Sequence, residues 1–123
     1  MNKYGNRRVT VGSEVFDSKK EYHRYLELKQ MQDSGQISDL QRQVKYVLIP
    51  SQYVDGYYDK KGKYIKKRKC LERELSYYAD FQYMKDGRPM VEDVKSPMTR
   101  KLAAYVIKRK LMLAKYGIQI KEV

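Results

Sequence analysis

Apolar and polar residues alternate most regularly in the middle of the chain. Every second residue from 75 to 83 is apolar, namely Leu75, Tyr77, Ala79, Phe81 and Tyr83. This period of two predicts a strand with that face on the core and with Tyr78, Asp80 and Gln82 on the other face. Asp86-Gly87 is a strong two-residue turn, so residues 90–95 are predicted to form the return strand of a hairpin.

This turn fixes the register of the hairpin and brings charged residues together. With a two-residue loop, Asp80 lies opposite Asp93, with Cβ atoms roughly 5 Å apart, where like charges destabilise a sheet unless a positive charge lies between them. Lys95 follows Asp93 by two residues and therefore shares its face. Two carboxylates beside a lysine predict a divalent metal site suited to phosphodiester hydrolysis. Glu92 falls on the apolar face, where the pattern gives no reason for a charge.

A helix and a strand are predicted upstream of the hairpin. Ser18 and Glu21 have the spacing of a capping box and start a tract with helical spacing of apolar residues over 19–34. After a short loop, residues 43–49 are predicted to form a strand that Pro50 ends.

The remaining segments complete a single domain. Residues 8–11 and 14–16 favour a small N-terminal hairpin, and Thr99 is predicted to cap a helix that runs to Tyr116. A last strand over 118–123 should pair in parallel with the return strand, because a strand, helix, strand unit normally makes a right-handed crossover. The predicted fold of the 123 residues is α/β (α+β), with a mixed central sheet flanked by helices in the order α-β-β-β-α-β.

Basic residues dominate the composition and are concentrated in residues 51–74. The chain has 27 Lys and Arg against 15 Asp and Glu, and a net charge of +12, which favours a polyanionic partner such as nucleic acid. Between residues 57 and 69 lie Lys60, Lys61, Lys63, Lys66, Lys67, Arg68 and Lys69, offset by Asp59 alone. Tyr57, Tyr58 and Tyr64 alternate with them, so this segment is interpreted as an exposed hairpin or flexible loop that contacts DNA.

Other residue types exclude several functional classes. A single cysteine, Cys70, cannot form an internal disulfide, and a single histidine, His23, argues against zinc clusters and His-metal nucleases. No P-loop motif and no apolar run of membrane-spanning length occurs in the sequence. We therefore expect a cytoplasmic protein without a membrane partner.

The chain resembles the PD-(D/E)XK nuclease superfamily. The resemblance lies in Asp80, the later Asp93-x-Lys95 and the upstream helical Glu21, and in the order of elements. More narrowly, residues 16–21, 35–40, 78–83, 91–95 and 115–117 are similar to those of small bacteriophage and prophage proteins placed in that superfamily. The sequence departs from that family between residues 51 and 73, which are longer and more basic here, and has Ala79 where the superfamily name has proline.

The resemblance implies a Mg²⁺- or Mn²⁺-dependent DNA endonuclease of phage or prophage origin, located in the host cytoplasm. Asp80, Asp93 and the backbone carbonyl of Val94 would hold the metal, Lys95 would position the attacking water, and Glu21 would assist or hold a second ion. By analogy, the substrate would be branched DNA such as a Holliday junction, cut by a homodimer.

Several alternatives remain open at this stage. Glu21 would serve equally well as a purely structural capping-box residue. The aspartate hairpin as a solvated edge neutralised by Lys95 is the less favoured alternative, because opposed carboxylates destabilise a sheet without compensation. Gln43 is better explained as a solvated strand residue than as a supporting group, and Asp39 and Glu92 are lesser ligand candidates. Lys101, Lys108 and Arg109 on the last helix are candidate DNA contacts, although Lys101, Lys108 and Lys115 recur every seven residues as on the solvent face of a helix.

Two non-catalytic functions compete with the nuclease. One is a nucleic-acid-binding protein that uses a nuclease-like fold for its basic surface, and the other is an RNA-binding regulator. Both would bind without cutting, and the second would prefer RNA to matched DNA.

Overall fold

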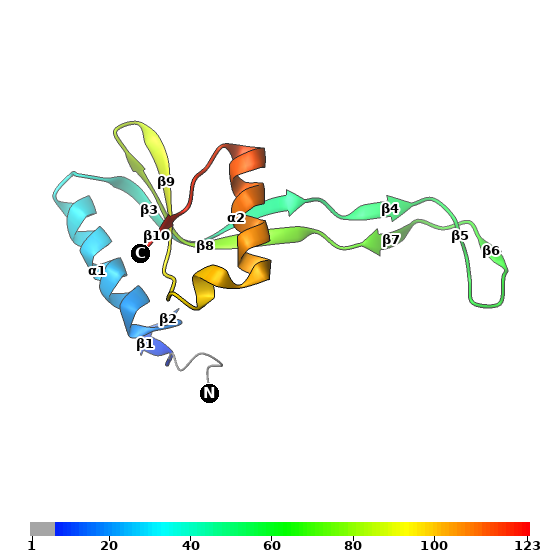
Figure 1. The fold of residues 1–123 in the computed structure, drawn as a ribbon, viewed down its shortest axis with the longest axis horizontal. Helices are drawn as coiled ribbons and strands as arrows, with labels where there is room; N and C mark the ends of the chain where they lie inside the picture. The colour runs from blue at the N-terminus through cyan, green and yellow to red at the C-terminus, as the bar shows by residue number, and fades with distance from the viewer. Residues whose placement is uncertain (1–6) are drawn as a thin grey trace.

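The computed structural model describes residues 7–123 and has an α+β fold with a mixed central sheet (Figure 1). Its four strands follow the order β10-β9-β8-β3. The bounds are β3 Ser38–Ile49, β8 Leu75–Lys85, β9 Arg88–Asp93 and β10 Lys121–Glu122. Two helices pack on this sheet, α1 Lys19–Asp33 and α2 Ala103–Tyr116. A small hairpin of β1 Val9–Val11 and β2 Glu14–Phe16 precedes α1, as the sequence predicted.

The core consists of two clusters, one under each helix. Leu28 of α1 packs with Ile37, Phe81 and Tyr83. The second cluster lies under α2 and contains Leu48, Tyr77, Ala79, Val91, Tyr105, Met112 and Ile120. Strand β9 is buried on both faces, because Val91 belongs to the α2 cluster while its neighbour Glu92 contacts α1. Two adjacent acidic residues of this strand, Glu92 and Asp93, are therefore both buried.

The long strand β3 passes from one helix to the other. Leu40 packs in the α1 cluster and Tyr46 in the α2 cluster, and both belong to the even-numbered residues that face inward along the strand. Between them Gln43 has left-handed backbone, with φ of 52°. The pairing with β8 keeps one register on both sides of Gln43, from Gln41 opposite Gln82 to Val44 opposite Ala79, so the alternation continues through it. Gln43 points to the opposite side from Leu40 and Tyr46 and lies beside Asp80 of the candidate site.

The predicted hairpin register is confirmed as far as the strand pairing extends. Lys85 pairs with Arg88 across a turn in which both Asp86 and Gly87 have positive φ, as a primed turn requires. Pairing continues to Phe81 and Glu92, one position short of the two aspartates. Strand β9 ends at Asp93 instead of Lys95, and its parallel pairing with β10 is confirmed.

The start of the last helix was predicted incorrectly. Thr99 begins a 3-10 turn, η1 Thr99–Lys101, and its hydroxyl accepts a hydrogen bond from the Ser96 N–H at 2.8 Å. Helix α2 then starts after Leu102, which provides no side-chain cap. Its C-terminus follows the prediction, because Gly117 takes the left-handed conformation, with φ of 66°, that closes the helix.

Residues 50–74 form a two-stranded arm that extends β3 and β8 away from the sheet (Figure 1). Its strands are β4 Gln52–Val54, β5 Tyr57–Tyr58, β6 Tyr64–Ile65 and β7 Lys69–Glu72. β4 pairs with β7, and β5 pairs with β6, both antiparallel. Of the two forms that the sequence allowed, the exposed hairpin is therefore the one observed. Within residues 7–123, no helix is both long and apolar enough to cross a membrane.

Candidate active-site cleft

A polar cleft of about 350 Å³ opens between the start of α1 and the segment that follows β9. Its walls include Glu21 and Lys20 from α1, Asp80 from β8, and Val94 and Lys95 after β9. Four of these five residues were predicted as site residues from the sequence. They come from three separate elements, so it is the tertiary fold that brings them together.

Glu21 is buried in the first turn of α1, with 2% of its surface exposed. Its backbone N–H donates to the Ser18 hydroxyl at 3.1 Å, as in a capping box. Its carboxylate, however, accepts from the N–H of Asp17 at 2.7 Å, not from that of Ser18 as predicted. Burial, followed by the nearby charge of Asp80, raises the pKa of Glu21 to about 7. Glu21 therefore both stabilises the helix start and brings a carboxyl group to the cleft.

Gln43 connects Glu21 to Asp80. Its side-chain Nε2 lies 3.2 Å from a carboxylate oxygen of Glu21 and 3.2 Å from one of Asp80. Gln43 is an exposed residue of β3, as predicted, and its amide also supports the two carboxylates. The other oxygen of Asp80 accepts from the Val94 N–H at 2.8 Å. These bonds fix the orientation of Asp80 at the cleft wall.

Asp93 lies below the cleft surface and is 2% exposed. It accepts a hydrogen bond from the Tyr77 hydroxyl at 2.8 Å and pairs with the Lys95 Nζ at 3.1 Å. Burial, together with a hydrogen bond to Asp80 and the charge of Asp80, raises the pKa of Asp93 to about 8. The predicted closeness of two aspartates and a lysine is therefore present in the structure, with Asp93 deeper than Asp80.

Lys95 is held on the α2 side of the cleft. Its Nζ lies 4.6 Å from the ring centre of Tyr105, in a cation–π contact, as well as beside Asp93. Lys20, which sequence reasoning missed, donates from its Nζ to the Lys95 carbonyl at 3.3 Å. A lysine in the first turn of a helix looks like an ordinary solvent-facing residue, so the sequence carried no signal for it.

Glu92 is a structural residue and not a metal ligand. Arg24 donates from Nε and Nη2 to its two oxygens at 2.7 and 2.8 Å, and the Tyr83 hydroxyl donates a third bond. Burial alone would raise the pKa of Glu92, but the hydrogen bonds from Arg24 and Tyr83 outweigh it and lower that pKa. This contact between α1 and β9 explains the charge on the apolar face. Asp39, the other lesser candidate, is exposed at the start of β3 and does not line the cleft.

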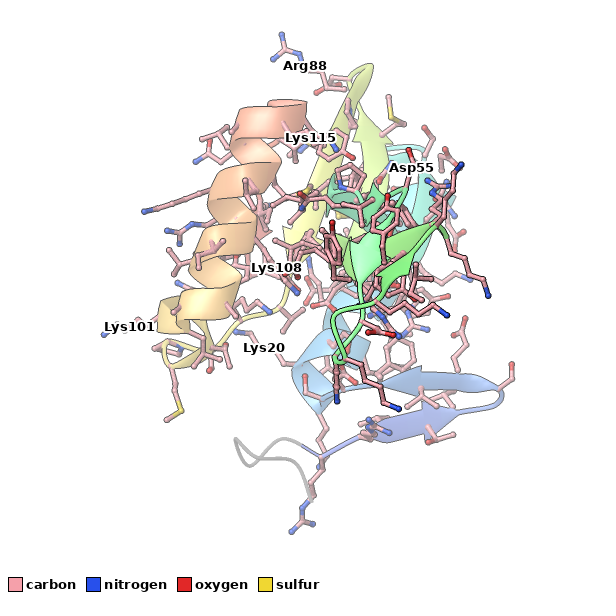
Figure 2. All side chains as sticks on the ribbon, turned by 90° about the vertical axis from the view of Figure 1, so that its right-hand side faces the viewer. Lys20, Asp55, Arg88, Lys101, Lys108 and Lys115 are labelled. Atoms are coloured by element: carbon pink, nitrogen blue, oxygen red, sulfur yellow. The ribbon has the colours of Figure 1, made fainter. Side chains whose placement is uncertain are left out.

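The residues proposed for nucleic-acid binding occupy two regions. Those of the arm are all exposed, namely Lys60, Lys61, Lys63, Tyr64, Lys66, Lys67, Arg68 and Lys69. The predicted lysine stripe on the last helix does not exist as one helical face, because Lys101 lies in η1 and Lys115 donates to the Val47 carbonyl at 3.0 Å (Figure 2). The Arg109 guanidinium lies 3.7 Å from the Glu122 carboxylate, so it already has a partner within the protein. Lys108 is half-buried on the same helix.

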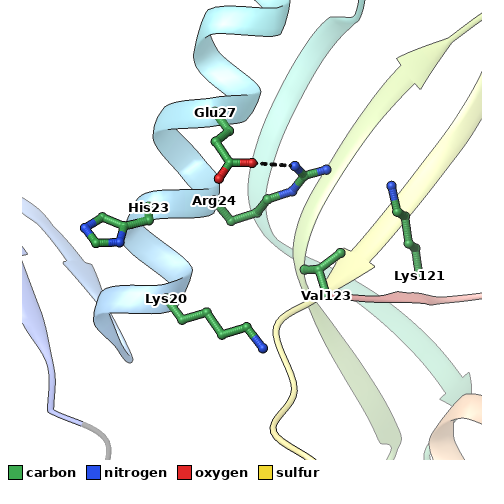
Figure 3. Close-up of a pocket in the computed structure, with 6 residues that line it drawn as sticks. All are labelled: Lys20, His23, Arg24, Glu27, Lys121 and Val123. Atoms are coloured by element: carbon green, nitrogen blue, oxygen red, sulfur yellow. Dashed lines mark hydrogen bonds and ion pairs between the residues drawn. The ribbon is translucent and has the colours of Figure 1, made fainter.

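A second pocket of about 510 Å³ lies between α1 and the C-terminal strand (Figure 3). It is lined by Lys20, His23, Arg24, Glu27, Lys121 and Val123, of which His23 is exposed. Arg24 is already bound by Glu27 and Glu92. Lys20 belongs to both pockets, so positive charge continues from the cleft around the start of α1.

The oxygen donors of the cleft bear on whether it can hold a metal ion. Within residues 7–123, no three His, Cys, Asp or Glu side chains form a ready metal-binding group. Mg²⁺ typically takes one or two carboxylates and completes its shell with waters and substrate phosphates, so a smaller donor set suffices. Glu21 and Asp93 have raised pKa values because burial and Asp80 disfavour their charged forms, and a cation would relieve this. The oxygen donors therefore fit a hard divalent ion.

Comparison with known proteins identifies the family but no activity. A family model described as "Protein of unknown function (DUF1064)" matches residues 1–122. The chain belongs to this family. No curated protein and no solved structure matched the chain. The family description gives no activity, so the cleft and the arm are the features that bear on function.

Proposed function

We propose that this DUF1064 protein is a metal-dependent endonuclease that hydrolyses phosphodiester bonds of DNA, with a core of the PD-(D/E)XK type. The observation that carries the proposal is the convergence of Glu21, Asp80 and Lys95 on one cleft, with Asp93 in contact with Asp80 beneath it. Buried carboxyl groups with raised pKa values in a cleft are typical of functional sites. The net charge of +12 and the exposed basic arm support a polyanionic substrate.

Asp80 and Asp93 would hold Mg²⁺ or Mn²⁺, with the backbone carbonyl of Val94 and with Glu21 as a further ligand or a support for water. When bound, such an ion supplies positive charge at the scissile phosphate and acidifies water. Hard divalent ions prefer oxygen ligands of this kind, so the donor set matches the proposed cofactor.

The side chains around these carboxylates have separate tasks in the proposal. Gln43 holds Glu21 and Asp80 by one amide group, and Tyr77 fixes Asp93 from below. Lys95 supplies a positive charge that stabilises the negative charge of the transition state. Lys20 adds a second ammonium group at the cleft wall, where the phosphate of a neighbouring nucleotide would lie.

The more specific substrate that we propose is branched DNA, such as a Holliday junction. This part of the proposal follows from the resemblance to small phage nucleases. A junction-cutting enzyme should act as a two-fold dimer, because it must cut paired strands symmetrically. Analytical ultracentrifugation with and without a four-way junction tests this assignment. A monomer that cuts linear duplex and junction equally well would rule it out while leaving the nuclease proposal intact.

The nuclease proposal is tested by incubating the protein with supercoiled plasmid and with four-way junctions in Mg²⁺, Mn²⁺ or EDTA. Ion-dependent cleavage is expected, with a loss of at least about a hundredfold in Asp80→Asn, Glu21→Gln and Lys95→Ala, because removing one preorganised charge typically costs this much. Asp39→Asn is the matched control, since Asp39 is an exposed aspartate of β3 outside the cleft. Equal activity in EDTA, or equal loss in the control, would contradict the proposal.

A non-catalytic nucleic-acid-binding protein is the competing function. It is favoured by the contacts of Lys95, whose ammonium group is engaged by Asp93 and Tyr105, and by the depth of Asp93. Under this alternative the protein would bind the same DNAs tightly without cutting, and isothermal titration calorimetry would detect no uptake of Mg²⁺ or Mn²⁺.

A further inference from the structure

The arm has the dimensions of a DNA-reading element. Its two strands run side by side from the sheet to the tip over residues 50–74, about a dozen residues in each direction, which corresponds to roughly 40 Å at ~3.3 Å per residue. Figure 2 looks along it from the tip, with Asp55 labelled on the arm. Eight Lys or Arg and four Asp or Glu lie in this segment, and residues 60–64 and 66–74 are all exposed.

Specific contacts give the arm a defined shape. At the tip, the Asp59 carboxylate accepts from the N–H groups of Lys61 and Lys63, each at 2.9 Å. Along the shaft, the Arg68 guanidinium lies 4.0 Å from the ring centre of Tyr53. Tyr64 packs so closely on Gly56 that a Cβ there would meet the phenol oxygen at 1.9 Å. A preformed arm loses less conformational entropy on binding than a flexible loop would.

These contacts also change the role expected for the tyrosines. Tyr53 has a ring face covered by Arg68, and Tyr57 has one covered by Lys69 at 4.5 Å. Tyr58 and Tyr64 pack against each other, with ring centres 5.2 Å apart. The rings therefore help to shape the arm, while Tyr53, Tyr58 and Tyr64 keep 49%, 73% and 54% of their surface exposed. Because the tyrosines alone do not select the kind of nucleic acid, the dimensions of the arm decide it.

Groove dimensions select the kind of duplex. Paired strands are about 4.8 Å apart, and with their side chains they match a DNA major groove of about 12 Å but not a minor groove of about 6 Å. The major groove of A-form RNA is too narrow for side chains to read. We propose that the arm lies in the major groove of double-stranded DNA, so that the substrate class is B-form DNA duplex next to the cleaved site. This inference rests on the proposed DNA partner but not on cleavage.

The first test measures binding without cleavage. The Asp80→Asn protein in EDTA is titrated by fluorescence anisotropy with a 30-base-pair DNA duplex, the RNA duplex of the same sequence, and the DNA with glucosylated 5-hydroxymethylcytosine, whose sugars fill the major groove. Binding to unmodified DNA should be at least about tenfold tighter than to either of the others, and netropsin in the minor groove should have little effect. Equal affinity for RNA, or no effect of glucosylation, would overturn the inference.

The second test assigns the effect to the arm. In the same background, Lys66→Gln with Lys67→Gln should lower the slope of log affinity against log salt by about 2, because each lost phosphate contact lowers it by roughly 0.9. The matched control, Lys85→Gln with Arg88→Gln, changes two exposed charges at the tip of the β8–β9 hairpin and should leave the slope unchanged. An equal change in both variants would contradict the inference.

The two proposals fail in different ways. If the arm binds DNA through the major groove but the wild type does not cut, the nuclease proposal is wrong and the proposed role of the arm stands. If ion-dependent cleavage is equally fast on glucosylated DNA and with the Lys66→Gln, Lys67→Gln protein, the nuclease proposal stands and the proposed role of the arm is wrong.

Discussion

The cleft and the arm use charged residues in opposite ways. In the cleft region, Glu21, Glu92 and Asp93 are buried, and each has specific hydrogen-bond partners that hold it in one orientation. In the arm, the basic residues are exposed, and the contacts there fix the shape of the strands. The first arrangement places a few groups accurately, as chemistry requires. The second provides positive charge over a long surface, as binding to a polyanion requires.

Stability should therefore be sensitive to charge changes near the cleft and insensitive to them in the arm. A charge removed from a buried network leaves its partner unpaired in a poorly solvated site, which is costly. An exposed charge is solvated in both folded and unfolded states, so its loss changes little.

The largest loss is expected for Arg24→Ala. This change leaves the fully buried Glu92 carboxylate without its bidentate partner, so the free energy of unfolding should fall by about 3–5 kcal/mol. Urea denaturation followed by circular dichroism measures it. Arg88→Ala, at the exposed hairpin tip, is the control and should cost less than about 0.5 kcal/mol. Similar losses in both variants would remove the distinction between buried and exposed charge.

A smaller loss is expected for Tyr77→Phe. Removing this hydroxyl takes a hydrogen bond from the buried Asp93, which should cost about 1–3 kcal/mol. Tyr78→Phe is a matched control in the next position of the same strand, where the side chain is exposed. If both variants unfold at the same urea concentration, the hydroxyl of Tyr77 does not support the site.

The pH dependence of stability should show the crowding of carboxyl groups in the cleft. The folded-state pKa values of Glu21 and Asp93, about 7 and about 8, lie above their ordinary values of 4.5 and 3.8. Between the ordinary and the folded-state pKa the folded state binds more protons than the unfolded state, so the free energy of unfolding falls as pH rises, by up to about 1.4 kcal/mol per pH unit for each buried carboxyl. Urea midpoints measured without metal at pH 5, 6.5 and 8 give this slope.

The same experiment distinguishes repulsion from burial. Asp80→Asn removes the charge that disfavours ionisation of both carboxyl groups, so the decline with pH should become shallower. Saturating Mg²⁺ should also stabilise the wild type more at pH 8 than at pH 6, because the ion competes with protons for the carboxylates. An ion effect that does not change with pH would count against binding at this cleft.

The smallest effect on stability is expected for a shortened arm. Replacing residues 57–64 with a two-residue Asn-Gly turn removes exposed strands outside both core clusters, so the free energy of unfolding should change by less than about 0.5 kcal/mol. DNA binding, measured by anisotropy in EDTA, should nevertheless weaken. A large loss of stability would show that the arm belongs to the same cooperative unit as the cleft.

Local sequence patterns were sufficient to predict much of the sheet. The alternation around Asp80 and the Asp86-Gly87 turn predicted the hairpin register, and the capping spacing of Ser18 and Glu21 predicted the start of α1. These features depend on residues a few positions apart, whose spacing the chain itself fixes. The exposure of the basic segment likewise followed from its composition.

Contacts between distant segments could not be predicted in this way. Arg24 and Glu92 are 68 residues apart, and nothing in either local pattern indicates that α1 would neutralise a charge on β9. Gln43 joins Asp80 to Glu21, which lies 22 residues away on α1, and the period-two pattern of β3 does not encode that contact. Sequence spacing thus determined that Asp80 and Asp93 lie close together on one hairpin. Only the packing of helices on the sheet decided which are buried, which are paired and which reach the cleft, because those outcomes depend on partners that the chain brings together by folding.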